Sequence, residues 1–201
     1  MQKGLLPTIV ALLIAGCGGS SLPKYYELKN LRIIALVADQ PEVAPGGSAT
    51  ITPILSDAFG GGRTLTYEAE LCADPGVGLG ALPNCSGNPT RISLGSGSVT
   101  GLNAPNYTGP VGTLNVNIPA TALAGRASYD QYNGVAWIVG YKVITPQGDQ
   151  LQAFRRIIVS SKTPKNTNPV FSDILSAGAS LTALPSGKTS LTASVSAGSS
   201  E

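Results

Sequence analysis

Histidine is missing from this chain of 201 residues, and charged residues make up only 12% of it. Without histidine the chain cannot build a Ser-His-Asp or Cys-His catalytic set, an imidazole-based zinc site or a histidine proton shuttle. The formal net charge is +2, and no basic cluster extends beyond the pair Arg155 and Arg156. Because nucleic-acid binding requires many clustered lysines and arginines, we predict no nucleic-acid partner. We also predict no cofactor.

The first 16 residues have the pattern of a secretory signal. Lys3 provides a basic start, an apolar run covers residues 5–14, and small residues lead up to Cys17. The apolar run is too short for a membrane-spanning helix, which needs about 20 apolar residues. Residues 14–17, Ile-Ala-Gly-Cys, resemble the lipobox of bacterial lipoproteins. In that family a peptidase cuts before the cysteine, which then carries the lipid.

The resemblance implies a membrane anchor at Cys17. Residues 1–16 would be removed, and residues 17–29 would supply the lipidated cysteine and a flexible tether. Gly18 takes the place at which aspartate favours inner-membrane retention in enteric lipoproteins. We therefore expect a lipid-anchored protein of the cell envelope, at the outer membrane. The alternative is an ordinary secretory signal with a chance cysteine near the cut.

Cys72 and Cys85 are the two cysteines that remain after Cys17. Two thiols alone make a poor metal site, and in an exported, oxidising compartment a pair of cysteines indicates a disulfide. The bridge would close a loop of about 14 residues and stabilise the fold by roughly 3 kcal/mol in the chain-entropy model. Two free thiols are the alternative.

Short apolar or alternating runs between glycines and prolines predict an all-β fold. The first run is nearly all apolar, which predicts a strand covered on both sides. Pro53 places the second run at a sheet edge or a bulge. Along the last pair of runs Val135, Trp137, Val139 and Tyr141 alternate, so we expect a hairpin whose Trp137 lies in the core. The clearest runs cover residues 31–38, 48–55, 64–72 and 135–160.

Two stretches, residues 31–47 and the hairpin over 140–159, resemble the immunoglobulin-like domains of bacterial surface lipoproteins. The resemblance implies an immunoglobulin-like antiparallel β-sandwich over residues 30–161. Antibody-type domains join their two sheets by a disulfide. Here Cys72 ends a strand and Cys85 lies in the loop that follows. The bridge should therefore staple a loop rather than the core.

Residues 162–168 are predicted to be a linker, and residues 169–201 the start of a second β domain. A repeat at an offset of 140 positions supports this hypothesis. Two strands cannot bury a core alone, so the second domain is expected to be incomplete and the chain to be a fragment. The alternative is a disordered tail rich in serine, threonine and alanine. The matched residues are Pro45, Gly47 and Thr52 with Pro185, Gly187 and Thr192.

The function that these features favour is a lipid-anchored, non-enzymatic module of the cell envelope. Its role would be structural, adhesive or protein-binding, and we predict no catalytic residues. The alternative is a glycan-binding module that uses Trp137 or the tyrosines Tyr107, Tyr129 and Tyr132. Exposed aromatic rings would favour glycan binding, whereas a buried Trp137 would weaken it.

Glu68 and Glu70 are the remaining candidates for chemistry. They lie two residues apart in a predicted strand, so they share one face of it. Such a pair can bind Ca²⁺ or act as catalytic carboxylates, and a solvated strand face gives the same pattern. An enzyme would need two acids that face each other in a cleft, and we predict that the pair is a solvated face.

Overall fold

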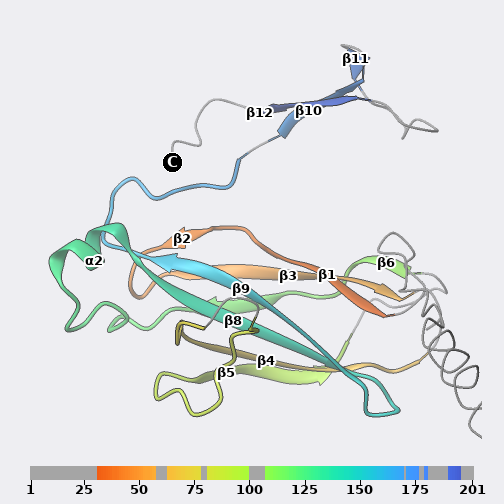
Figure 1. Ribbon diagram of the computed structural model, residues 1–201, viewed down its shortest axis with the longest axis horizontal. Coiled ribbons are helices and arrows are strands. Elements are labelled where there is room, and N and C mark those ends of the chain that lie inside the picture. Colours follow the sequence, from red (N-terminus) through yellow and green to blue (C-terminus); the bar gives the residue numbers. More distant parts are fainter. Residues whose placement is uncertain are drawn as a thin grey trace, which may run out of the picture.

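The computed structural model describes residues 31–57, 63–77, 81–99, 107–169, 171–176, 179–180 and 190–195. Most of the regular structure in these residues is β-strand, and the α-helix that they contain is α2 (Ser128–Asn133), six residues long. The predicted all-β class is therefore confirmed. The strands β1 to β9 form two sheets that share one core, and β10 to β12 form a third sheet (Figure 1).

The first sheet is built around β3, which has neighbours on both sides. One side pairs with β1, and the other side pairs with β6 along one half and β7 along the other half. All of these pairings are antiparallel. The bounds are β1 (Arg32–Ala38), β3 (Ser48–Asp57), β6 (Tyr107–Pro110) and β7 (Leu114–Asn117).

The second sheet has five strands in the order β2-β9-β8-β4-β5. Strand β2 runs parallel to β9, while the other pairs are antiparallel, so the sheet is mixed rather than purely antiparallel as expected. The hairpin predicted over residues 135–160 is present as β8 and β9. The bounds are β2 (Glu42–Val43), β9 (Gln150–Val159), β8 (Val135–Ile144), β4 (Thr66–Ala73) and β5 (Ile92–Ser98).

The expectation that the first apolar run is covered on both sides is wrong. Strand β1 lies at an edge of its sheet, and the side chains of Ile34 and Val37 are 47% and 50% exposed. A shift in register between Ile33 and Ala35 marks a bulge in this strand. Apolar side chains are common on protein surfaces, so an apolar run alone does not establish that both faces are buried.

Pro53 lies in the central strand of its sheet, not at an edge. On one side of β3, the partner strand changes at Pro53 from β6 to β7. The last pair with β6 is Ile54↔Pro110, and the first pair with β7 is Ile51↔Leu114. The Pro53 carbonyl accepts the amide of Val111 at 2.9 Å, so the prolyl nitrogen faces the same side. A nitrogen without a hydrogen is tolerated there because the regular ladder is interrupted.

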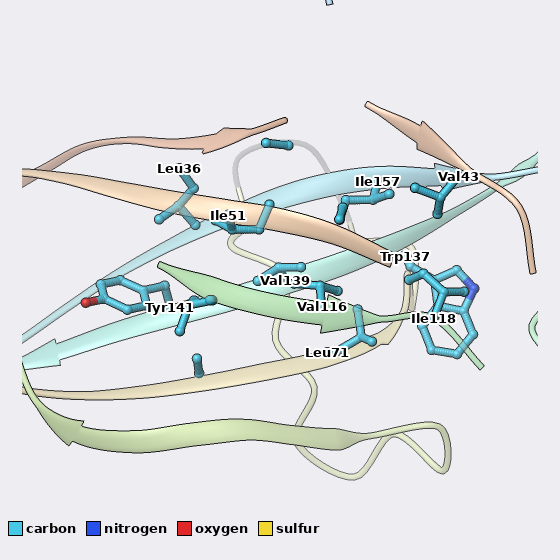
Figure 2. Packing of buried hydrophobic residues seen from close by; sticks show 14 of the residues in the cluster. Leu36, Val43, Ile51, Leu71, Val116, Ile118, Trp137, Val139, Tyr141 and Ile157 are labelled. Atoms are coloured by element: carbon cyan, nitrogen blue, oxygen red, sulfur yellow. The ribbon is translucent and has the colours of Figure 1, made fainter. Parts of the chain in front are cut away.

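The core lies between the first two sheets, as Figure 2 shows for residues of β3, β7 and β8. Trp137, Val139 and Tyr141 are 3%, 0% and 3% exposed, which confirms their predicted inward orientation. Tyr67 is half-buried, and its ring stacks on that of Tyr141 with centroids 5.5 Å apart. Burial, with a smaller contribution from Tyr67, raises the pKa of Tyr141 to about 12.

The third sheet pairs β10 (Phe171–Ser176) with both β11 (Ala179–Ser180) and β12 (Leu191–Val195). The pairing of β10 with β12 matches that of β1 with β3 pair by pair. Phe171↔Val195 corresponds to Ile33↔Leu55, and both ladders shift register after this pair. The second strand keeps the expected offset of 140, whereas the first strand is offset by 138. Pro185 and Gly187 lie outside the described residues.

The segment predicted as a linker is held against the domain by Glu42, which is 2% exposed. The Glu42 carboxylate accepts the Ser160 hydroxyl and the Asn166 amide, the latter at 2.8 Å. The ammonium of Lys165 donates to the Ser160 carbonyl at 2.6 Å. Burial alone would raise the pKa of Glu42. The hydrogen bonds from Ser160 and Asn166, with the charges of Lys162 and Lys165, lower the pKa overall.

We expect Glu42→Gln to release this segment and to remove one acid-sensitive part of the stability. An amide cannot accept both hydrogen bonds or balance the lysines, so the free energy of unfolding should fall by roughly 1–3 kcal/mol. Because the folded pKa lies below the ordinary value of 4.5, the carboxylate stabilises the fold above that pH. This contribution is lost as pH falls through the folded pKa. Urea unfolding across this acid range measures it.

The control for this variant is Asp130→Asn, at an exposed acid on α2. It should leave stability nearly unchanged. Limited proteolysis should cut the Glu42→Gln chain faster than the wild type within residues 162–168. Equal cutting, together with equal acid sensitivity, would show that Glu42 does not hold the segment.

Candidate functional site

A disulfide joins Cys72, near the end of β4, to Cys85 in the following loop, with the two Cα atoms 5.7 Å apart. The predicted bridge is therefore confirmed. Both cysteines are fully buried with Ile138, and Phe154 packs against them in a cluster separate from the main core. The bridge thus fastens the loop to the five-stranded sheet, as expected, and does not join the two sheets.

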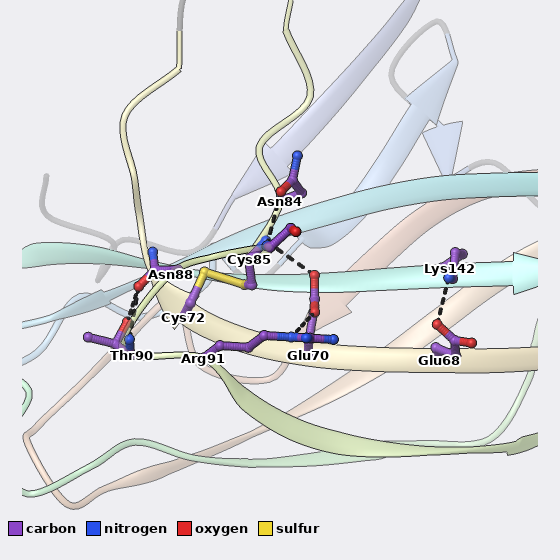
Figure 3. A network of polar contacts seen from close by, with 10 residues as sticks. Glu68, Glu70, Cys72, Asn84, Cys85, Asn88, Thr90, Arg91 and Lys142 are labelled. Carbon is purple, nitrogen blue, oxygen red and sulfur yellow. Dashed lines mark hydrogen bonds and ion pairs between the residues drawn. A yellow bond between two sulfur atoms is a disulfide. The ribbon is translucent and has the colours of Figure 1, made fainter.

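Polar contacts complete the attachment of this loop (Figure 3). The Asn88 amide donates to the Ala73 carbonyl at 2.9 Å, and the Ala73 amide donates to the Thr90 hydroxyl at 2.8 Å. The Thr90 hydroxyl in turn donates to Asn88 at 2.8 Å. Because these bonds satisfy backbone groups at the end of β4, the returning chain is fixed beside the sheet.

The register of the sheet arranges outward-facing side chains in rows across the strands. One row contains Ser96, Glu68, Lys142 and Gln152, from β5, β4, β8 and β9 in turn. Its centre is an ion pair, in which the Lys142 ammonium lies 2.6 Å from the Glu68 carboxylate. This row therefore presents hydroxyl, carboxylate, ammonium and amide groups side by side.

The next row contains Ser93, Glu70, Gly140 and Phe154. Glu70 binds the loop, because its carboxylate accepts the Cys85 amide at 3.2 Å and the Arg91 guanidinium at 2.7 Å. Gly140 leaves a gap between Glu70 and Phe154. A β-carbon added at Gly140 would lie 3.2 Å from the Glu70 Cγ, so this position accommodates the carboxylate side chain.

Arg156, two residues further along β9, packs over the ring of Phe154. The guanidinium carbon of Arg156 lies 5.2 Å from the centre of the Phe154 ring, within cation–π range. Arg156 also donates to the Asp74 carboxylate at 2.5 Å. Burial by itself would raise the pKa of Asp74. The hydrogen bonds from Arg156 and the Gly76 amide lower it overall, so this carboxylate favours its charged form.

The two rows and the loop that carries Cys85, called the stapled loop below, enclose a groove of about 470 Å³ on the outer face of the five-stranded sheet. This volume lies within the range of small-molecule binding sites, roughly 300–1,000 Å³. The floor is formed by β4, β5, β8 and β9, and the loop supplies one wall through Leu82, Pro83, Asn84 and Ser86. We take this groove as the candidate functional site.

The predicted carboxylates Glu68 and Glu70 do share one face of their strand, and both line the groove. Each is engaged by a cation, Glu68 by Lys142 at 2.6 Å and Glu70 by Arg91 at 2.7 Å. They do not face each other across a cleft, because both project from the same side of β4. Among the described residues, no group of three or more acids and cysteines is placed to hold a metal ion.

The aromatic residues predicted for glycan binding do not line this groove. Trp137 is buried in the core, which removes it as a binding platform. Tyr129 and Tyr132 are 77% and 57% exposed on α2. Tyr107 is half-buried, and its hydroxyl donates to the Pro110 carbonyl at 2.5 Å. Exposure alone therefore favours Tyr129 and Tyr132, at a place distinct from the groove.

Sequence reasoning named only Glu68 and Glu70 among the groove residues, and those it missed include Gly140, Lys142, Gln152 and Phe154. They occupy the outward positions of the hairpin formed by β8 and β9. The alternation that placed Trp137 inward also places Gly140 and Lys142 outward, so the signal was present in the sequence. Cys17, predicted to carry lipid, lies outside the described residues. Within those residues no helix has the length and apolar character needed to cross a membrane.

No protein-family model matches this chain, and no curated protein matches it. Similarity is found to solved structures. The alkylpurine DNA glycosylase AlkC of Pseudomonas fluorescens, bound to DNA containing an abasic-site analogue, is 12% identical with a TM-score of 0.39. The match covers 66% of this chain and 31% of AlkC.

Two further structures are similar to the same extent. The sporulation control protein Spo0M of Bacillus subtilis is 10% identical with a TM-score of 0.36, over 66% of this chain and 50% of Spo0M. The superoxide reductase of Ignicoccus hospitalis is 12% identical with a TM-score of 0.36, over 66% of this chain and 81% of the reductase. This chain matches about half or less of AlkC and Spo0M. Similarity at this level carries no argument about what this chain does.

Removal of the disulfide by the double change Cys72→Ala and Cys85→Ala should lower the free energy of unfolding by roughly 3 kcal/mol. Without the bridge, the small cluster on the outer face holds the loop less tightly. Amide hydrogen exchange should therefore accelerate within residues 81–91. Urea unfolding and exchange mass spectrometry measure the two effects.

The matched control is Ser86→Ala in the same loop, which should change stability by no more than about 0.5 kcal/mol. If the double variant has unchanged stability and unchanged exchange in the loop, the bridge does not determine the wall of the groove.

Proposed function

We propose that this chain is a lipid-anchored module of the cell envelope that binds a partner in the groove and carries out no catalysis. Lipid on Cys17 attaches it to the membrane, at the outer membrane, and residues 17–29 tether the folded domain. Residues 30–161 form an immunoglobulin-like β-sandwich, which presents the groove on its five-stranded sheet. The binding role is the part of this proposal that the geometry supports best.

The binding role rests on the ion pairs that the two groove carboxylates form. Glu68 and Glu70 each form an ion pair, with N–O distances of 2.6 and 2.7 Å. A carboxylate pair of the glycoside-hydrolase type needs two acids that flank the substrate bond, with separations of about 5–10 Å. Two paired acids on one side of a strand instead supply fixed acceptors, which orient a bound ligand.

The strand order supports the immunoglobulin-like assignment. In such domains strands A, B and E pair in one sheet, and strands G, F and C pair in the other, with a further strand beside C in the variable type. Here β1, β3 and β7 correspond to the first set. Strands β9, β8, β4 and β5 correspond to the second set. The pair Cys72 and Cys85 departs from the inter-sheet bridge of antibody domains.

A second β domain starting at residue 169 also forms part of the proposal. The pairing of β10 with β12 repeats that of β1 with β3, including the shift in register. Equivalent pairing in two parts of one chain supports duplication of a structural unit. Residues 162–168 then join the two units, with Glu42 holding this segment against the first domain.

Cys17→Ala should move the protein from the membrane fraction to the soluble fraction. Lipidation requires this thiol, and multiple acyl chains are what makes anchoring stable. Fractionation of cells that express each form measures the change, and mass spectrometry of the wild type should find lipid on an N-terminal Cys17. A soluble wild-type protein that begins at another residue would refute the anchor.

The binding role is tested in the same cells by a photo-reactive benzoylphenylalanine placed at Gln152, an exposed position in the groove. We expect irradiation to produce an adduct heavier than the chain. The same group at Asn115, which is exposed on β7 in the other sheet, is the matched control and should give none. No adduct at Gln152, or equal adducts at both positions, would contradict a partner in the groove.

A further inference from the structure

We infer that the groove binds a neutral saccharide, with its hydroxyl groups on the polar row and its apolar ring face toward Phe154. This inference rests on the proposed binding function and names the ligand class. It assigns glycan binding to residues other than the tryptophan and tyrosines that the sequence suggested. The carrying observations are the charge balance of the groove and its two rows of side chains.

The charges of the groove are balanced in fixed pairs. Two acids, Glu68 and Glu70, are each neutralised by a cation from another part of the chain, Lys142 and Arg91. The groove therefore offers a charged ligand no excess of the opposite charge. A neutral ligand with many hydroxyl groups can donate to the carboxylates and accept from the cations without breaking a pair.

The row through Glu68 and Lys142 offers both kinds of hydrogen-bonding group. Ser96 and Gln152 extend it on either side, and each of their side chains can donate and accept. Neighbouring strands lie about 4.8 Å apart, so the side chains leave the sheet at that spacing, and the tips of Glu68 and Lys142 converge to 2.6 Å. A line of donors and acceptors suits a ligand that carries several hydroxyl groups.

Phe154 and Gly140 supply the apolar side of the site. They lie one row away from Gln152 and Lys142, a separation of about 7 Å along the strands. Gly140 has no side chain, and the Glu70 side chain lies over it in the row that continues to Phe154. A sugar ring has polar edges and an apolar face of C–H groups, and aromatic rings bind such a face. The row of Glu68 and Lys142 therefore faces the hydroxyl groups of the sugar, and Phe154 in the next row faces its apolar side.

An extended peptide is the competing occupant, and the observations favour it less. A peptide that adds to a sheet pairs with the backbone of an edge strand, which here is β5 on one side and β9, beyond its short pairing with β2, on the other. The groove instead lies on the face of the sheet and crosses β4, β5, β8 and β9, whereas in the described residues the backbone groups without a ladder partner lie at the sheet edges, along β5 and along the part of β9 that β2 does not reach. Side chains rather than backbone groups must therefore make the contacts.

The test uses the purified lipidated chain in detergent and saturation-transfer difference NMR. Cello- and chito-oligosaccharides are the neutral probes, oligogalacturonides the acidic probe and a serine-glycine peptide the extended probe. We expect neutral saccharides to bind, and Gln152→Ala and Lys142→Met each to weaken binding about tenfold or more through lost hydrogen bonds. Tyr129→Ala and Tyr132→Ala, at exposed rings outside the groove, are the controls and should bind as the wild type does.

Thermal unfolding of each variant shows whether the fold is retained, and Gln152, as an exposed residue, gives the variant least able to disturb it. Binding of the acidic probe or the peptide in place of the neutral probes would overturn the saccharide class. The groove adduct at Gln152 would still support the proposed function. Loss of binding in the tyrosine variants only, or no binding of any probe, would also overturn the inference. Membrane release by Cys17→Ala does not depend on these outcomes.

Discussion

The register of β4, β8 and β9 is the constraint on which the rest of the structure depends. Because side chains alternate in a strand, one register sends Trp137, Val139 and Tyr141 into the core. The same register sends Gly140 and Lys142 outward. A slip by one residue would exchange the two sets, exposing the core side chains and burying the ion pairs. The apolar inner face therefore fixes the geometry of the polar outer face.

The stapled loop has little apolar support of its own, which explains why it carries the disulfide. Within the part of the loop and sheet that the structure describes, its outer-face cluster consists of the two cysteines, Ile138 and part of Phe154. So small a cluster cannot offset the entropy of ordering a long loop. The bridge restricts the unfolded loop, and the Glu70 carboxylate then fixes its position through the Cys85 amide. Loop, bridge and carboxylate together form the wall of the groove.

Charged side chains are scarce in this protein, and several of them form ion pairs with one another. Arg63 binds the buried Asp57 through two hydrogen bonds at 2.9 and 2.8 Å, and Arg156 binds Asp74. The groove pairs follow the same pattern. Exposed ion pairs contribute little to stability, so the value of the groove pairs lies in the orientation they give to their side chains. The result is a polar site without excess charge, which distinguishes it from sites for phosphate or acidic ligands.

The sequence by itself determined the local features of this protein. Alternation placed Trp137 in the core, the absence of histidine excluded whole classes of chemistry, and the two cysteines that follow a secretory-signal pattern predicted their bridge. These depend on residue type and short spacing, which the sequence states directly. Only the tertiary structure decided that β1 lies at an edge and that Pro53 lies in a central strand, because strand neighbours are far apart in sequence. The rows that form the groove arise in the same way, from the pairing of distant strands.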